Sequence, residues 1–329
     1  MQTRSMIILG ARSFLGSVLA DAITNQWLDE GFQVDRLLVT GKPERVKRHD
    51  SNSITEAVID YNRFIQMKLS RFDLAIQAAS PTAITQMASP EYRTSLWRLN
   101  VELTDKLITS AQNASEKSNH RPLVVYFSSR EVYAGLQGLD VADEEQVVTT
   151  GTLNARSIYR TAKLLGENLL SAAAQDGILQ AHRLRIAHVY GPGMRFGDGR
   201  VLGDLFDDAF NHRTVRFFGD GKHLLQPMHI QDFVGAVRSV LDSGVESSVW
   251  NVAHPTPIDV RSVAKILGMA ASKEVESIPR ENHDRPYLRE AVPLLSVKKL
   301  MDVGWKPAMD HEAGFMAQFG IGPARDVLR

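Results

Sequence analysis

The sequence predicts an α/β protein built on a doubly wound parallel sheet, with a smaller domain towards its C-terminal end. Apolar runs of strand length alternate with helical patterns as far as about residue 188, and a glycine-containing turn over residues 10–16 joins the first strand to the first helix. After residues 190–193, glycines, histidines and short mixed segments replace this alternation. We therefore expect a first domain over residues 1–188, with returns to its sheet near 223–253, and a second domain over residues 189–329.

Each element of the first domain follows from a local pattern. Short apolar runs bounded by polar or glycine-containing segments predict strands. Leucines recur at spacings of three and four between Leu96 and Leu107, which predicts an amphipathic helix. Alternation of strands and helices implies right-handed crossovers between parallel strands. The predicted strands are Ser5–Gly10, Val34–Thr40, Ile54–Ile59, Asp73–Gln77, Leu123–Ser128 and Leu179–His188, and the other helices are Phe14–Trp27 and Ser157–Ala174.

Composition excludes several classes of function. The 329 residues are 43% apolar, and 38 basic side chains balance 38 acidic ones, so we expect no nucleic-acid or membrane partner. Cysteine is absent, which excludes disulfides and thiolate chemistry, and the histidines lack metal-ligand spacing, so no metal site is expected. The segment before the first strand is too short for a signal peptide, and no apolar run approaches ~20 residues. We expect a cytoplasmic protein.

The turn after the first strand suits dinucleotide binding in a Rossmann-type fold. Gly10 permits the tight turn, Gly16 permits close packing of helix on strand, and the amino terminus of the helix receives the pyrophosphate. Ser13 stands where a glycine is usual, so the fingerprint is imperfect. The residues predicted to bind the cofactor at this turn are Gly10, Arg12, Ser13, Phe14, Leu15 and Gly16.

The end of the second strand favours NADP over NAD. An NAD site usually places an acid there to bind the ribose hydroxyls. In this chain no acid follows Thr40 directly, whereas Lys42 and Arg45 follow within a few residues. Arg12 lies in the glycine turn, and a guanidinium matches a 2′-phosphate well. We therefore predict NADP as the preferred cofactor, with NAD as the alternative.

A tyrosine and a lysine on one helix supply the predicted chemistry. Lys163 lies four residues after Tyr159 and therefore on the same face. A phenol has a pKa of roughly 10, and we expect the ammonium of Lys163 to lower the pKa of Tyr159. Tyr159 would then remove a proton from a hydroxyl, or return one to a carbonyl oxygen. Ser129, where a strand ends, would hydrogen-bond the reacting oxygen, and Lys163 would also bind the nicotinamide ribose.

The ordered motifs, from the glycine turn through Ser129 and Tyr159 to residues 226–233 and 303–307, resemble the extended short-chain dehydrogenase/reductase family, the nucleotide-sugar epimerases and dehydratases. The resemblance covers almost the whole chain. It implies a homodimer formed by the Leu96–Leu107 helix and the helix that follows Tyr159. It also implies further cofactor contacts, by Asp60, Tyr61, Ala78, Ala79, Ser80, Asn100, Tyr159, Lys163 and His188.

Departures from the family pattern bear on the reaction. The 4,6-dehydratases carry Thr-Asp-Glu where this chain has Ser129, Arg130 and Glu131, so a base replaces the dehydratase acid. Glu131 is interpreted either as a second acid/base or as a ligand of a sugar hydroxyl. Leu225 occupies the place of a diphosphate-binding arginine in many members. The predicted substrate contacts are Ser80, Ser129, Arg130, Glu131, His188, Arg285 and Arg289, the last two as alternative sources of that charge.

We therefore expect NAD(P)-dependent hydride transfer by an epimerase or a keto-sugar reductase, on a sugar that we expect to be linked to a nucleotide. The catalytic residues would be Ser129, Glu131, Tyr159 and Lys163. Two alternatives stay open at this point: a dehydratase or decarboxylase that uses Glu131, and a non-catalytic dinucleotide-binding protein on the same fold.

Overall fold

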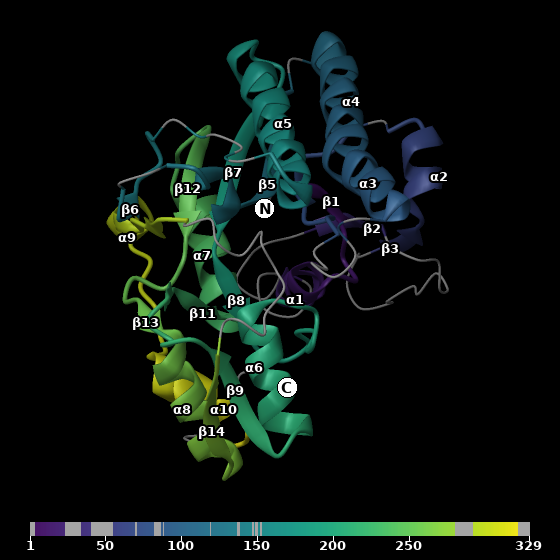
Figure 1. Cartoon of the computed structure of the whole chain (residues 1–329). Coiled ribbons are helices and arrows are strands. Elements are labelled where there is room, and N and C mark those ends of the chain that lie inside the picture. Colours follow the sequence, from purple (N-terminus) through teal and green to yellow (C-terminus); the bar gives the residue numbers. More distant parts are fainter. Residues whose placement is uncertain are drawn as a thin grey trace.

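The computed structural model describes residues 4–23, 34–40, 55–69, 71–81, 87, 89–118, 120–136, 139–146, 148, 151, 153–279 and 292–321. At its centre is a seven-stranded sheet in the order β12-β7-β5-β4-β1-β2-β3, in which every neighbouring pair is parallel (Figure 1). Its strands are β1 (Arg4–Leu9), β2 (Val34–Thr40), β3 (Thr55–Ile59), β4 (Leu74–Gln77), β5 (Leu123–Ser129), β7 (Gln180–Ile186) and β12 (Ser248–Val252). The predicted Rossmann-type α/β fold is confirmed.

Helices cover both faces of this sheet because side chains alternate along each strand. Met6 and Ile8 pack against α1 and α7 on one face. Ile7 and Leu9 pack against α2, α4 and α5 on the other. Figure 1 shows α4 and α5 side by side along that second face. These helices are α1 (Phe14–Ala22), α2 (Tyr61–Gln66), α4 (Leu103–Ser118), α5 (Ala155–Gln175) and α7 (Ile230–Asp242).

The leucine-spaced helix continues beyond the range that the spacing predicts. It consists of α3 (Pro90–Trp97), a π-helical segment (Arg98–Glu102) and α4. Ser89 caps its start, since its hydroxyl accepts a hydrogen bond from the backbone of Tyr92 at 3.1 Å. Wider turns of this kind are frequent at functional sites, and in this chain the segment carries the buried Asn100.

The predicted strand Leu179–His188 is two strands. β7 ends at Ile186, where it still pairs with β12. β8 (His188–Tyr190) then leaves the large sheet and pairs with β11 (Pro227–His229). Apolar residues continue through the break, so the sequence pattern does not mark it; the separate partner of β8 does. His188 consequently lies beyond the end of the main sheet.

A second core lies at the other end of the molecule from α4 and α5 (Figure 1). It includes buried side chains such as Phe206, Val263 and Phe315. β12 belongs to the large sheet, and α7 packs in the core against that sheet. The chain therefore crosses between the two cores more than once. A division at residue 188 stays a prediction. The remaining elements are β6 (Val141–Ala142), α6 (Val201–Asn211), β9 (Thr214–Phe218), β10 (Leu224–Leu225), β13 (Ile258–Asp259), α8 (Val260–Ala271), β14 (Glu274–Ile278), β15 (Leu294–Leu295), α9 (Lys298–Asp302) and α10 (His311–Ala317).

A buried ion pair fastens α5 to the sheet. Arg185 of β7 donates from Nη2 to Oε2 of Glu167 at 2.8 Å, and its Nε lies 3.2 Å from both carboxylate oxygens. Glu167 also accepts a hydrogen bond from the hydroxyl of Ser128, which lies near the end of β5. Both charged groups are buried. The pair therefore joins one helix to two neighbouring strands.

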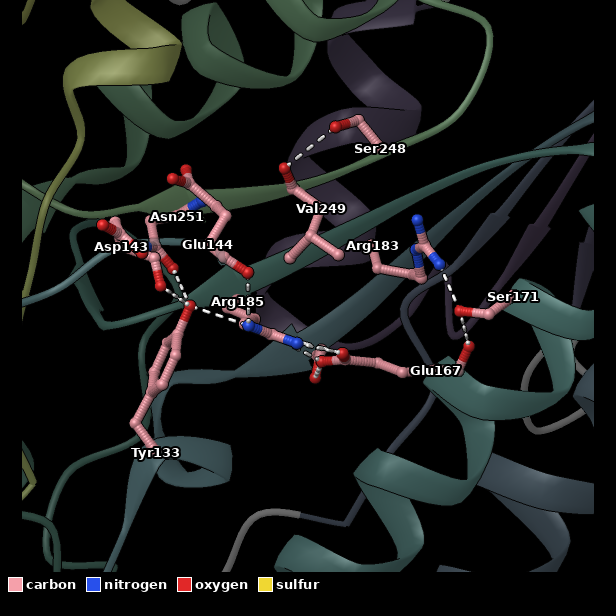
Figure 2. A network of polar contacts seen from close by, with 11 residues as sticks. Tyr133, Asp143, Glu144, Glu167, Ser171, Arg183, Arg185, Ser248, Val249 and Asn251 are labelled. Carbon is pink, nitrogen blue, oxygen red and sulfur yellow. Dashed lines mark hydrogen bonds and ion pairs between the residues drawn. The ribbon is translucent and has the colours of Figure 1, made fainter. Parts of the chain in front are cut away.

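The same arginine reaches further polar groups (Figure 2). Its Nη1 donates to the Tyr133 hydroxyl at 2.8 Å, and that hydroxyl lies 2.9 Å from Oδ1 of Asn251 on β12. The backbone N–H of Asn251 donates to Oε1 of Glu144 at 2.8 Å. Polar groups in a dry interior are costly unless partnered, and here each has a partner. The network thereby fixes the loop after β5 against β7 and β12.

We expect Arg185→Met to lower the free energy of unfolding by about 3–5 kcal/mol, because Glu167 would remain buried without its partner. Urea denaturation measures the change. Lys298→Met is the control, since Lys298 and Asp302 pair at 2.6 Å with side chains 79% and 59% exposed, and such a pair contributes at most about 1 kcal/mol. Similar losses in both variants would contradict a structural role for the buried pair.

Candidate functional site

Two glycines shape the turn between β1 and α1. Gly10 has φ +82°, in the left-handed region. A Cβ at this position would lie 2.7 Å from the backbone nitrogen of Ala79, and a Cβ at Gly16 would lie 2.2 Å from the carbonyl oxygen of Gly10. The turn is therefore packed backbone to backbone against α1 and against the segment after β4, which only glycine allows.

The amino terminus of α1 suits an anion. Ser13 is the N-cap residue, and its hydroxyl accepts a hydrogen bond from the backbone of Gly16 at 3.2 Å. The N–H groups of Phe14 and Leu15, in the first turn, have no acceptor among the described residues. Free amides at the positive end of a helix are the usual partners of a phosphate. These residues fit the pyrophosphate of a dinucleotide.

The other predicted cofactor residues lie at neighbouring strand ends. The backbone of Ala78 donates to the carbonyl of Leu9 at 2.9 Å, which holds the segment after β4 beside β1. Asp60 follows β3 and caps α2 by accepting from the backbone of Arg63 at 2.8 Å, while Tyr61 packs partly into the core. Arg12 is exposed in the turn. Lys42 and Arg45, on which the NADP prediction also depends, lie outside the described residues.

Asn100 connects the segment after β4 to the π-helical segment through hydrogen bonds. Its Nδ2 lies 3.2 Å from the Ser80 hydroxyl and 3.0 Å from the carbonyl of Leu96, and its Oδ1 accepts from the Tyr126 hydroxyl at 3.3 Å. Because both polar atoms have protein partners and the side chain is fully buried, Asn100 holds the turn at Ser80 against the π-helical segment. The sequence predicts a cofactor contact here, and the geometry shows a positioning contact.

Tyr159 and Ser129 meet at the carboxyl end of β5. Asn154 and Ser157 form a capping box that starts α5, so Tyr159 falls in the helix's second turn. Burial raises the pKa of the Tyr159 phenol above its ordinary value. A hydrogen bond with Ser129 opposes that rise, as does the charge of Arg200. The phenol therefore holds its proton at neutral pH.

Lys163 is buried below the tyrosine. Its Nζ donates to the carbonyl of Phe127 at 2.6 Å and lies 5.9 Å from the centroid of the Tyr159 ring. Burial lowers the pKa of Lys163 to about 7, although the charge of Glu167 favours the ammonium. The expectation that Lys163 lowers the pKa of Tyr159 is wrong for this structure. Spacing brings the two side chains to one face, but burial of the phenol outweighs the distant ammonium.

Glu131 forms ion pairs with two arginines that the sequence pattern did not predict as site residues. Arg156 donates from Nε to Oε2 at 2.8 Å and from Nη2 to Oε1 at 2.7 Å, and Arg160 Nε lies 3.5 Å from Oε2. Burial raises the pKa of Glu131, but the charges of Arg156 and Arg130 outweigh burial and leave it below the ordinary value. Their places beside Tyr159 on the same helix are the signal that could have identified them.

Arg130 and His188 are far from the glycine turn in the sequence, and the charge of Arg130 acts on His188. Arg130 follows Ser129 and donates from Nη2 to the carbonyl of Val292 at 3.0 Å. His188 is half-buried on β8. Burial lowers the pKa of His188 well below its ordinary value, and the charges of Arg130 and His223 lower it further. His188 is therefore neutral. Arg285 and Arg289 lie outside the described residues.

The fold and the site define a dinucleotide-binding α/β protein with a tyrosine–lysine pair at the carboxyl end of a central strand. Residues 6–253 match the model of the NAD dependent epimerase/dehydratase family. The chain belongs to this family of enzymes, and its predicted membership of the extended short-chain dehydrogenase/reductases is confirmed.

Known proteins resemble the chain at low identity. UDP-glucuronic acid decarboxylase 1 of Xenopus tropicalis is 25% identical over 188 residues, which cover 57% of this chain and 44% of that protein. The chain thus matches less than half of that relative's length. MoeE5 in complex with UDP-glucuronic acid and NAD has a TM-score of 0.72 at 22% identity, covering 96% of this chain and 98% of the other. DesIV, a dTDP-glucose 4,6-dehydratase from Streptomyces venezuelae with NAD and TYD bound, has a TM-score of 0.74 at 17% identity, covering 96% of each. These likenesses show the fold.

Two further findings concern the described part of the chain. None of its helices is both long enough and apolar enough to span a bilayer. Nor does it contain three or more histidine, aspartate or glutamate side chains grouped so as to hold a metal ion.

We expect Gly10→Ala to destabilise the protein more than Gly177→Ala. Both glycines have positive φ, at +82° and +72°, so both variants carry the left-handed penalty of about 1–2 kcal/mol. A Cβ at Gly177 meets nothing within 4 Å, whereas one at Gly10 collides with the backbone of Ala79. Urea denaturation of both variants isolates the collision. Equal losses would show that the turn is not tightly packed.

The buried lysine predicts a pH dependence of stability. Since the pKa of Lys163 falls from 10.5 to about 7 on folding, the unfolded chain binds more protons above about pH 7. Stability contributed by this group therefore rises with pH, by at most ~1.4 kcal/mol per pH unit. The free energy of unfolding of the wild type should gain on that of Lys163→Met between about pH 7 and pH 9. A difference that stays constant over this range would contradict the prediction.

Proposed function

We propose that the protein modifies a nucleotide-linked sugar by reversible hydride transfer, as an epimerase or a keto-sugar reductase, with Tyr159 as the acid/base. The observation that carries this proposal is the position of Ser129 beside the Tyr159 phenol, whose pKa it lowers, with Lys163 buried one helical turn further along. This group lies at the carboxyl end of β5, the side of a parallel sheet on which ligands bind. The family match supports it.

Each residue of the proposed site has a separate role in the reaction. When bound, a nicotinamide dinucleotide supplies the hydride acceptor and donor. The amides of Phe14 and Leu15 hold its pyrophosphate. Tyr159 takes a proton from the sugar hydroxyl as the carbon is oxidised, and returns one to the oxygen as the carbon is reduced. Ser129 keeps the phenol and the reacting oxygen within one hydrogen-bond chain.

The geometry disfavours Glu131 as a second acid/base. A catalytic acid must release and regain a proton near the working pH. Glu131 is held by a two-pronged contact with Arg156 at 2.7 and 2.8 Å, and its pKa is lowered. We therefore assign Glu131 to a charged anchor that orients Arg156 and Arg160. A dehydratase or decarboxylase that uses Glu131 remains the second candidate, supported by the named activities of two similar proteins.

We propose NAD as the cofactor. The NADP preference expected from the sequence lacks support among similar proteins, since MoeE5 and DesIV were both solved with NAD. The description of the matched family also names NAD. The homodimer formed by the Leu96–Leu107 helix and α5, and a cytoplasmic location, are proposals carried over from the sequence analysis.

Removal of one hydroxyl tests the acid/base assignment. Tyr159→Phe should lower turnover by ~10²–10⁴-fold, the usual contribution of a positioned proton donor, while the dinucleotide still binds. Tyr92→Phe is the matched control. Tyr92 is buried and packs beside Tyr159, and among the described residues its hydroxyl donates to the carbonyl of Pro81 at 3.2 Å. Turnover in Tyr159→Phe close to that of the control would refute the assignment.

Fluorescence titration with NADH and NADPH tests the cofactor. We expect NADH to bind at least as tightly as NADPH, and Arg12→Ala to affect both nucleotides alike. If Arg12 instead contacts a 2′-phosphate, NADPH would bind about tenfold to a hundredfold more tightly, as a charge-assisted hydrogen bond allows. Arg12→Ala would then erase that advantage selectively, and the choice of NAD would be wrong.

A further inference from the structure

The arginines around Tyr159 are not all held in ion pairs with described residues. Arg156 and Arg160 share the carboxylate of Glu131. Arg200 pairs with Asp198 at 2.6 Å. Arg130 forms no ion pair with any described residue. Since its charge and those of Arg156 and Arg200 all act on His188, these cations gather at one place, and together they outnumber the acids that neutralise them.

Arg130 is also short of hydrogen-bond partners. The residue is 5% exposed, and Nη2 alone has an acceptor, the carbonyl of Val292. Nε and Nη1 are buried without a partner among the described residues, and so is Nδ1 of His188. A buried charge with free donors costs several kcal/mol unless an anion compensates it. The unpartnered atoms of Arg130 and His188 thus mark a polar site that the described residues do not fill.

The position of Arg130 indicates which anion it would bind. It directly follows Ser129, whose hydroxyl contacts the Tyr159 phenol, and consecutive Cα atoms lie about 3.8 Å apart. Since both residues lie at the carboxyl end of β5, we infer that an anion bound by Arg130 would lie near the reacting end of the substrate. A diphosphate would lie beyond the ring, whereas a ring substituent would be within reach.

We propose that Arg130, with His188 beside it, binds a carboxylate carried by the reacting sugar, so that the substrate is a nucleotide-linked sugar acid. The inference rests on the proposed function and makes its substrate class specific. A guanidinium matches a carboxylate in shape and charge. Glu131 would not repel that carboxylate, because Arg156 and Arg160 already neutralise it. Arg130 is then a specificity-determining residue, and Tyr159 keeps its role on the hydroxyl.

Calorimetric titration of the NAD-saturated protein tests the inference with three ligands. UDP-glucuronate carries a carboxylate on the ring carbon where UDP-glucose carries a hydroxymethyl group, and UDP lacks the sugar. The wild type should bind UDP-glucuronate about tenfold to a hundredfold more tightly than UDP-glucose. Arg130→Gln should remove that advantage and leave the affinities for UDP-glucose and UDP within about twofold. Arg238→Gln, on α7 and paired with Asp242, should change none of them.

Each other outcome has a defined meaning. Equal weakening of all three ligands in Arg130→Gln would assign Arg130 to the diphosphate and overturn this inference, with the proposed function intact. A wild type that binds UDP-glucose as tightly as UDP-glucuronate would also overturn it. Failure of all three ligands to bind the wild type would overturn the proposed function as well. If Arg130→Gln does not fold, Arg130→Lys keeps the charge, and it should retain part of the preference for UDP-glucuronate.

Discussion

The buried pair between Arg185 and Glu167 is the interaction on which the site depends. Glu167 lies one helical turn after Lys163, and it accepts from Ser128, the residue before Ser129. One carboxylate therefore fixes the helix that carries the acid/base and the strand end that carries its hydrogen-bond partner. In a dry interior such contacts are rigid, because any displacement leaves a buried charge exposed to apolar surroundings.

The pKa values of Tyr159 and Lys163 follow from burial more than from neighbouring charges. Burial raises the pKa of Tyr159 and lowers that of Lys163 to about 7. The resting state therefore has a protonated phenol and a lysine that changes charge near neutral pH. A ligand that covers the site would bring its own charges to this balance. In an enclosed, low-dielectric place, a small change in neighbouring charge has a large effect on proton transfer.

Three consecutive residues after β5 show how one strand end can set the chemistry. Ser129 lies beside the phenol, two buried donors of Arg130 lack a partner among the described residues, and Glu131 is held by Arg156. The family resemblance implies an acid at the position of Arg130 in 4,6-dehydratases. Replacement of that acid by a buried cation changes what the site can protonate and what it can bind. The scaffold, including the glycine turn at Gly10 and Gly16, remains suited to the same dinucleotide.

The sequence by itself determined the fold class, because strand and helix periods and the glycine turn are local patterns that require no distant partner. It also placed Tyr159 and Lys163 on one face of a helix, because they lie four residues apart, and Ser129 at the end of a strand. Tertiary structure alone decided the break between β7 and β8, which depends on the distant β11. It likewise decided the pKa values and the state of Glu131 and Arg130, because burial and ion pairing join residues far apart in the chain. Those contacts leave no local pattern in the sequence.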